Sequence, residues 1–232
     1  MLDYCKTSDG SFSLYNREYK DYYHSLKDGA ILESLYKHII PTFNLQNIKE
    51  GLNILDICFG LGYNSFFSLL YAKRYNFSIN IYSVEKDIAL LQKLKYFKYP
   101  KILQNNFSLP LLLESKIFYF SDSTLRIFIG DALSYIKKLK LDSFDIIYQD
   151  AFSPSKNDEL WSNDYFKTLF LLLKDNGVIS TYTSSKKIRN ICMNCGFNVY
   201  DMRCGTLKNG TILSKQNLKS DKIDCISLYK IT

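Results

Sequence analysis

The chain has 232 residues, of which 47% are hydrophobic, and it carries a formal net charge of +7 at pH 7. This length is enough for one α/β domain to bury a core without disulfide bonds. No apolar run reaches the roughly 18 residues of a membrane span, and the N-terminus lacks a signal-peptide pattern, so we expect a cytoplasmic protein.

Cysteines and charge limit the ligands that the chain could take. Cys192 and Cys195 have the spacing of half a zinc site, but no second pair or nearby histidine completes it, so we expect no metal. A basic chain with 16% aromatic residues fits an anionic partner such as RNA. The same composition also fits an AT-rich genome, which favours the codons of Lys, Tyr and Phe. The sequence does not predict the oligomeric state.

The first fifty residues differ in pattern from the rest. Asp9-Gly10 is a turn signal between two short strand-like runs. Residues 29–40 are predicted to form a helix that stops at Pro41. We expect residues 1–50 to form an extension of hairpin and helix that packs on a core domain of residues 51–232.

Beyond residue 50, short apolar strands alternate with helices. The helix that begins at residue 163 is expected to end before Asn176-Gly177, a C-cap signal, and two last strands near 211–214 and 225–229 are expected to form a hairpin. The other predicted strands are 53–58, 79–84, 117–120, 125–129, 144–148, 178–183 and 198–202, and the predicted helices are 64–75, 87–97, 132–139, 163–173 and 186–195.

This alternation predicts the fold class. Strands and helices at this spacing form βαβ units, so we expect an α/β, Rossmann-like fold with a mostly parallel sheet of seven strands. A terminal hairpin would add an antiparallel edge strand.

A glycine turn follows the first predicted strand of this domain, in the run Asp56-Ile57-Cys58-Phe59-Gly60-Leu61-Gly62-Tyr63-Asn64. Gly60 and Gly62 allow a tight turn close to a ligand, and the helix behind them favours an anionic group. That group is pyrophosphate in a dinucleotide oxidoreductase and the methionine carboxylate in an S-adenosylmethionine-dependent methyltransferase. Asp56 favours the methyltransferase, because it could hold the methionine ammonium, and Ser65 stands where an oxidoreductase would have its third glycine.

Acidic residues end three further strands. Glu85 could accept hydrogen bonds from both ribose hydroxyls, or it could be an exposed residue at a helix start. Asp131 could bind the adenine amino group, cap the next helix, or do both. Asp150 reaches the carboxyl edge of the sheet. The loop behind it contains Phe152 and Pro154, which could stack on a flat substrate, and Lys156, which could contact a phosphate. Alternatively, Asp150 caps the loop and Phe152 is a core residue.

The run from Asp150 onward resembles the methyltransferase domain of the MnmC family, which modifies the wobble uridine of tRNA. The residues in register with that family are Asp150, Phe152, Pro154, Lys156, Asn157, Trp161, Thr181, Thr183 and Ser184. The chain departs from the family at Cys58 and Ala151, where the family has glycine. It also departs at Asp56, where family members often have glutamate. The flavin-dependent oxidase domain of many members is absent, so the chain resembles a stand-alone form.

The resemblance implies a class I methyltransferase fold and S-adenosyl-L-methionine as cofactor. It implies methylation of the 5-aminomethyl group in the tRNA anticodon stem-loop, giving 5-methylaminomethyl(-2-thio)uridine. Asp150 would orient the amine and Phe152 would support the base by stacking. The expected cofactor-binding residues are Asp56, Cys58, Gly60, Gly62, Asn64, Glu85, Asp131 and Asp150, with Tyr23 and Glu33 closing the pocket. The expected tRNA-binding residues are Phe152, Pro154, Lys156, Lys186, Lys187, Arg189 and Lys208.

Two other functions remain open. One is a methyltransferase that acts on a different amine, in a small molecule or a protein. The other is a non-catalytic RNA-binding Rossmann domain that has lost the cofactor, an interpretation that rests on Cys58 in the glycine turn.

Overall fold

A computed structural model describes residues 3–48, 51–108, 115–218, 222–223 and 225–231. Ten strands in this part of the chain form one sheet, in the order β12-β13-β10-β11-β9-β8-β4-β5-β7-β6. The parallel strands are β4 (Leu52–Ile57), β5 (Ile79–Glu85), β7 (Ser123–Ile129), β8 (Phe144–Gln149) and β9 (Leu173–Thr181). The antiparallel strands are β6 (Ile117–Phe120), β10 (Asn198–Cys204), β11 (Gly210–Ser214), β12 (Lys222–Ile223) and β13 (Ile226–Lys230).

Helices cover both faces of the sheet, which explains why the central strands are apolar on both sides. In β4, Ile54 packs into the hydrophobic cluster on one face and Leu55 into the cluster on the other. The first face carries α1 (Ala30–Glu33), the π-helix η1 (Ser34–Ile39), α2 (Ile40–Asn44), α3 (Tyr63–Arg74), α4 (Ile88–Leu94) and α5 (Lys101–Asn106). The second carries α7 (Ala132–Ile136), the 3₁₀ helix η3 (Asp158–Trp161), α8 (Asn163–Leu172) and α9 (Lys186–Asn194).

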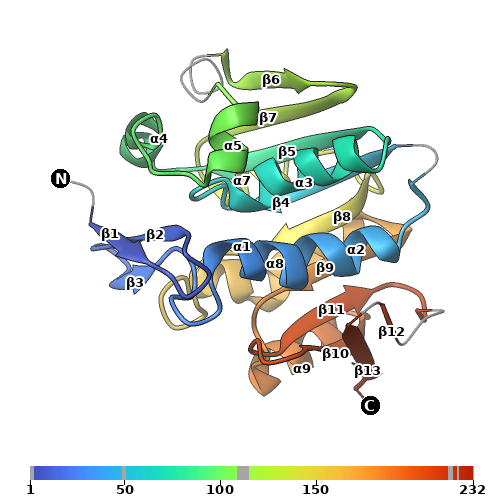
Figure 1. Ribbon diagram of the computed structural model, residues 1–232. Coiled ribbons are helices and arrows are strands. Elements are labelled where there is room, and N and C mark those ends of the chain that lie inside the picture. The colour runs from blue at the N-terminus through green and yellow to red at the C-terminus, as the bar shows by residue number, and fades with distance from the viewer. Residues whose placement is uncertain (1–2, 49–50, 109–114, 219–221, 224, 232) are drawn as a thin grey trace.

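The N-terminal segment packs against the first face. Strands β1 (Tyr4–Lys6), β2 (Phe12–Asn16) and β3 (Asp21–Tyr22) form a small sheet at one end of the molecule (Figure 1). The hairpin expected at Asp9-Gly10 is confirmed, since β1 and β2 pair antiparallel. The run from α1 to α2 lies beside α3, and Leu14, Ile39 and Phe43 join the same apolar cluster as Ile54.

The prediction that the first helix stops at Pro41 is wrong. The helical run continues to Asn44, with Pro41 in the first turn of α2. Proline lacks the N–H and crowds the carbonyl of the preceding turn, which breaks a regular α-helix. Here the six residues before α2 form a π-helix, whose wider turn changes the hydrogen-bond pattern at the point where the proline enters.

Three further expectations about the second half of the sheet are wrong. Asn176-Gly177 does not cap a helix, because β9 begins at Leu173 and contains both residues, with a register irregularity opposite Phe144 and Ile146. The last two predicted strands do not pair with each other, since β11 and β13 lie on opposite sides of β10. The sheet has ten described strands where seven were expected, and β12 is the strand that the sequence did not predict.

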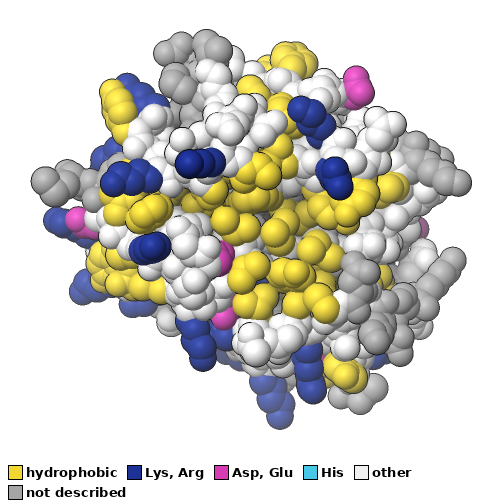
Figure 2. All heavy atoms as spheres, viewed as in Figure 1, with side chains coloured by type: hydrophobic (Ala, Val, Ile, Leu, Met, Phe, Trp, Pro, Cys, Tyr) yellow, Lys and Arg dark blue, Asp and Glu magenta, His cyan; other side chains and the backbone are white. Residues whose placement is uncertain are grey.

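No helix in the described part of the chain is both long and apolar enough to cross a membrane. The face seen in Figure 2 carries scattered Lys and Arg side chains around apolar areas and few acidic ones.

Candidate active site

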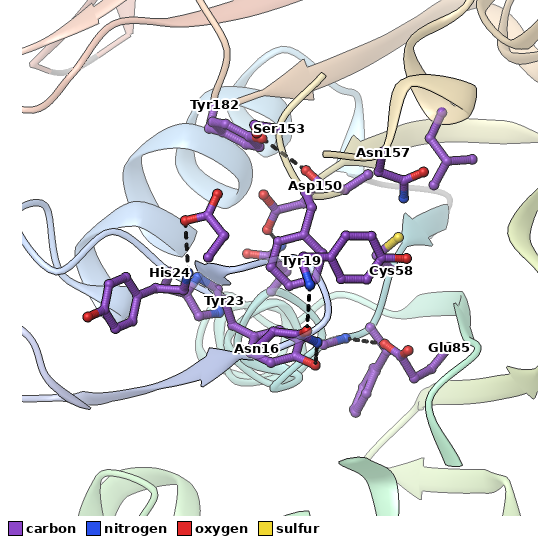
Figure 3. Close-up of a pocket in the computed structure, with 18 of the residues that line it drawn as sticks. Asn16, Tyr19, Tyr23, His24, Cys58, Glu85, Asp150, Ser153, Asn157 and Tyr182 are labelled. Carbon is purple, nitrogen blue, oxygen red and sulfur yellow. Dashed lines mark hydrogen bonds between the residues drawn. The ribbon is translucent and has the colours of Figure 1, made fainter. Parts of the chain in front are cut away.

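A cavity of about 450 Å³ lies where the carboxyl ends of β4, β5, β7 and β8 meet the N-terminal segment. Open α/β sheets bind ligands at this edge. The strand ends contribute Cys58, Glu85, Asp131 and Asp150 to the wall, and the chain from Asn16 to Asp28 covers them from the other side. Figure 3 shows side chains from both sources converging on the same space. The structure therefore brings together four residues that the sequence pattern selects.

The glycine turn has the backbone conformation that its sequence predicts. Cys58, Gly60 and Gly62 have φ angles of 68°, 55° and 76°. A Cβ atom on Gly62 would lie 2.6 Å from the rings of Phe59 and Phe66, so glycine is required there. Cys58 adopts the left-handed region as a non-glycine residue and still lines the cavity. Burial raises the pKa of its thiol well above the usual range, so the side chain is a neutral apolar wall.

Glu85 is held by two backbone N–H groups. Gly60 donates to Oε2 and Asp87 donates to Oε1, each at 2.9 Å. The residue is 8% exposed, and burial raises the pKa of its carboxyl despite these bonds. Glu85 therefore ties the glycine turn to β5 and presents its carboxyl to the cavity; it is not the exposed residue that the alternative interpretation requires.

Asp56 does not lie on the cavity wall. Its side chain is fully buried under the turn, where Oδ2 accepts hydrogen bonds from Ser65 at 2.6 Å and Ser83 at 3.2 Å. Burial, with the nearby charge of Asp150, raises the pKa of Asp56 to about 7. Direct contact with a methionine ammonium, as the sequence suggests, is therefore not the arrangement seen, and Gly62 is likewise absent from the wall.

Asp131 has the capping role that the sequence leaves open. Its Oδ1 accepts from the backbone N–H of Ser134 at 2.8 Å, at the start of α7. The residue also lines the cavity and is exposed. Capping uses one carboxylate oxygen, so the other remains available to a ligand.

Asp150 lies at the end of β8 with its side chain 12% exposed. Asn64 donates from Nδ2 to Asp150 Oδ2 at 2.7 Å. On the other side, Nε2 of the buried His38 lies 3.6 Å from Oδ1. The Oδ1 atom of Asn64 is buried beside the cavity and has no hydrogen-bond partner among the described residues. Asn64 Oδ1 and the carboxylate of Asp150 thus give this edge of the cavity two hydrogen-bond acceptors suited to a polar or cationic ligand.

The loop after Asp150 is clamped by two aromatic side chains. Tyr182 donates from its hydroxyl to the carbonyl of Ala151 at 3.0 Å, and Trp161 donates from Nε1 to the carbonyl of Phe152 at 2.8 Å. The Phe152 ring stacks on Tyr19, with centroids 4.4 Å apart, and lies 5.1 Å from the ring of Tyr23. Phe152 therefore faces aromatic rings of the N-terminal segment at the cavity and is not a core residue.

Glu33 belongs to a buried ion cluster at the same cavity. Lys37 Nζ lies 2.8 Å from Asp28 Oδ2 and 3.2 Å from Glu33 Oε1, and His24 Nδ1 lies 3.4 Å from Glu33 Oε2. Burial alone would raise the pKa of the Glu33 carboxyl, but the contact with His24 and the charge of Lys37 outweigh it and hold the pKa well below its usual range. Glu33 is therefore a charged anchor that fixes the N-terminal segment over the cavity.

The expected substrate-binding residues are distributed unevenly. Phe152 and Lys208 line the cavity, whereas Pro154, Lys156, Lys186 and Lys187 do not, and the three lysines are exposed. Arg189 is paired internally with Asp201 and also donates to the carbonyl of Gly210 at 2.9 Å. Its guanidinium thus joins α9 to β10 and β11, an arrangement that does not favour a role in RNA contact.

Several residues at the site carry no signal in the sequence. His38, Tyr19 and Tyr182 reach the site from segments far from the glycine turn, and a pattern search along the chain offers no reason to select them. Among the residues that the structure describes, no group of three or more His, Cys, Asp or Glu side chains is arranged to hold a metal ion.

Comparison with known proteins agrees with this geometry. Residues 94–217, more than half of the chain, match a family described as S-adenosyl-L-methionine-dependent methyltransferase. The chain belongs to this family. The crystal structure of MnmC2 from Aquifex aeolicus superimposes on the methyltransferase with a TM-score of 0.82 and 33% identity, covering 93% of this chain and 71% of that chain. The cofactor of the present methyltransferase is S-adenosyl-L-methionine, not the dinucleotide of an oxidoreductase.

The methyltransferase is also related to longer proteins. It is 30% identical over 198 residues to the tRNA 5-methylaminomethyl-2-thiouridine biosynthesis bifunctional protein MnmC of Campylobacter hominis. That match covers 80% of this chain and 28% of the relative. An uncharacterised protein of Methanocaldococcus jannaschii is 29% identical over 218 residues, covering 91% of this chain and 59% of its own length. The chain therefore spans only part of these curated relatives.

Proposed function

We propose that this methyltransferase N-methylates the 5-aminomethyl group of the tRNA wobble uridine, giving 5-methylaminomethyl(-2-thio)uridine. The observation that carries the proposal is that Asp150 and Phe152 both line the cavity. A carboxylate beside an aromatic ring suits a flat base that carries an amine. The relationship to MnmC and MnmC2 proteins supports the choice of a tRNA base.

The cavity residues are suited to S-adenosylmethionine. Glu85 would accept from the ribose hydroxyls and Asp131 from the adenine amino group, because each carboxylate keeps free lone pairs beside the backbone bonds that it accepts, two at Glu85 and one at Asp131. The unpartnered Oδ1 of Asn64 would accept from the methionine ammonium. Cys58 and Gly60 would border the cofactor, with Tyr23 and Glu33 closing the far side. The cofactor supplies an electrophilic methyl group on a positively charged sulfur.

The chain itself must align the amine that attacks. A free alkylammonium and an aspartic acid differ by roughly 6 pKa units, so proton transfer between them would cost roughly 8 kcal/mol. Asp150 is therefore not assigned the role of a simple general base. It would orient the neutral amine and stabilise the positive charge that the nitrogen gains, while the Trp161 and Tyr182 bonds keep the loop rigid.

The rest of the tRNA would be held by charge. The net charge of +7 favours an anionic partner, and Lys208 at the cavity and the exposed Lys156, Lys186 and Lys187 are available to phosphates of the anticodon stem-loop. These contacts would position the tRNA without reading its sequence.

The proposal is tested by nucleoside mass spectrometry of tRNA treated with the purified protein and cofactor. We expect the 5-aminomethyluridine of a tRNA that lacks only this methyl group to gain it, and Asp150→Ala to abolish the gain while cofactor binding persists. Full activity of Asp150→Ala would contradict the role of this residue. Methylation of a free amine or a protein, with none on tRNA, would instead indicate the alternative substrate class.

A further inference from the structure

His38 is a buried histidine with one nitrogen aimed at the candidate catalytic carboxylate. The residue is 0% exposed and is absent from the cavity wall, so it reaches the site only through Asp150. Its Nδ1 lies 2.9 Å from Ser180 Oγ on β9. Its Nε2 lies 3.6 Å from Asp150 Oδ1 and has no hydrogen-bond partner among the described residues. A buried nitrogen without a hydrogen-bond partner costs free energy, so its presence beside Asp150 needs a physical explanation.

The two ring nitrogens constrain each other. If Nδ1 carried the only proton, Nε2 would present a lone pair to a carboxylate oxygen, which is repulsive. If the hydroxyl of Ser180 donates a hydrogen bond to Nδ1, then Nδ1 is unprotonated. In that tautomer Nε2 carries the ring proton and points it at Asp150. The second arrangement satisfies the serine hydroxyl and matches the negative charge of the carboxylate. The ring is also packed edge-on against Tyr148, with centroids 5.5 Å apart, which limits its rotation.

The element that carries His38 explains its position. Residues Ser34–Ile39 form the π-helix η1, and its consecutive residues Lys37 and His38 are both buried. Lys37 joins the ion cluster of Glu33, whereas His38 turns to β8 and β9. Single π-helical turns inside α-helices often occur at functional sites.

We propose that His38 is a positioning residue for Asp150, holding an Nε2–H group toward Oδ1 while Asn64 holds Oδ2. This proposal rests on the function proposed above for Asp150. The present separation of 3.6 Å is too long for a hydrogen bond. Such contacts commonly shorten when the ligands bind, and a small rotation of the carboxylate would close this one. The carboxylate would then meet the substrate amine in one orientation.

The tautomer can be measured in the free protein. The chain has two histidines, His24 and His38, so ¹⁵N-histidine labelling gives a spectrum that a His24→Gln variant assigns. We expect His38 to be protonated on Nε2 and bare on Nδ1, with an Nε2 resonance that moves in Asp150→Asn. A bare Nε2, or a resonance that Asp150→Asn leaves unchanged, overturns the proposal whatever the substrate is.

Kinetics then separate positioning from folding. We expect His38→Met to lower kcat roughly 10- to 100-fold with little change in KM, as for loss of a hydrogen bond to a charged group. His38→Gln, which keeps an N–H near the same place, should recover much of the rate. In an Asp150→Asn background His38→Met should have no further effect, because the residue acts through that carboxylate. Equal kcat values for His38→Met and wild type, or additive losses in the double variant, would refute the positioning role.

Ser180→Ala provides a milder test with a matched control. It removes the donor to Nδ1, so both tautomers become accessible and kcat should fall a few-fold. Ser123→Ala removes one buried serine hydroxyl that accepts from the N–H of Ile79 at 3.0 Å. Ser123 is the first residue of β7, at the amino ends of the strands and away from the cavity. This variant should lower Tm comparably without changing kcat. If wild-type protein does not methylate aminomethyl tRNA, the proposed function fails, while the NMR result still decides the role of His38.

Discussion

At the scale of single residues, the buried carboxyl of Asp56 makes the stability of the protein depend on pH. Its pKa of about 7 lies above the unfolded value of 3.8, because burial and the charge of Asp150 disfavour ionisation. The folded state therefore binds more protons than the unfolded chain between these pH values. The stability that this group contributes is present at low pH and is lost as the pH rises through 7, by about 4 kcal/mol in all.

Asp56→Asn removes this pH dependence. We expect the cofactor-free variant to melt at a higher temperature than wild type at pH 8, with the difference shrinking toward pH 5, since an amide cannot ionise. Melting curves across that range measure it. A constant difference at every pH would show that Asp56 does not titrate there.

Cys58 supports a second prediction at this scale. The backbone of Cys58 has a φ of 68°, at which a non-glycine residue carries strain of about 1 kcal/mol and glycine carries none. We expect Cys58→Gly to bind S-adenosylmethionine at least as tightly as wild type in a calorimetric titration. Cys58→Val should bind much more weakly, because a β-branched residue is strained there. Weaker binding by Cys58→Gly would mean that the sulfur itself contacts the cofactor.

At the scale of elements, α7 has an N-cap that also faces the cavity. Asp131→Asn should keep the cap, since asparagine caps as well as aspartate, and so leave Tm nearly unchanged. Asp131→Ala should lose about 1 kcal/mol of stability. Cofactor affinity should fall in both variants if the carboxylate binds the adenine amino group. Ser162→Ala, which removes the cap of α8 away from the cavity, should lower Tm and leave affinity unchanged.

At the scale of the whole molecule, charge governs the encounter with tRNA. We expect the logarithm of the association constant for tRNA to fall linearly with the logarithm of salt concentration. Lys208→Ala should reduce the magnitude of that slope by about 1, because one phosphate contact is lost. Lys140 is exposed and precedes β8, at the edge of the sheet away from the cavity, so Lys140→Ala serves as the control. Identical slopes for both variants would exclude Lys208 from the tRNA-binding surface.

Also at this scale, the arrangement of strands explains which site residues the sequence could predict. The carboxyl ends of parallel strands meet at one edge, so Glu85, Asp131 and Asp150 could be grouped from their positions after apolar runs. Asp56 lies in the strand that the sequence predicts, but its side chain is buried and does not line the cavity. Its burial depends on hydrogen bonds that the hydroxyls of Ser65 and Ser83 donate to its carboxylate under the turn, and no local sequence pattern predicts that packing.

The sequence by itself determined the alternation of strand and helix, the glycine turn and the acids at the strand ends, because these depend on local periodicity and backbone conformation. Only the tertiary structure decided that helix passes through Pro41, that Asn176 and Gly177 lie in a strand, and that β11 and β13 flank β10. It also decided that Tyr19 stacks on Phe152 and that His38 faces Asp150. The physical reason is that packing of the whole core outweighs local preference, and the last two contacts join segments more than a hundred residues apart that no local pattern relates.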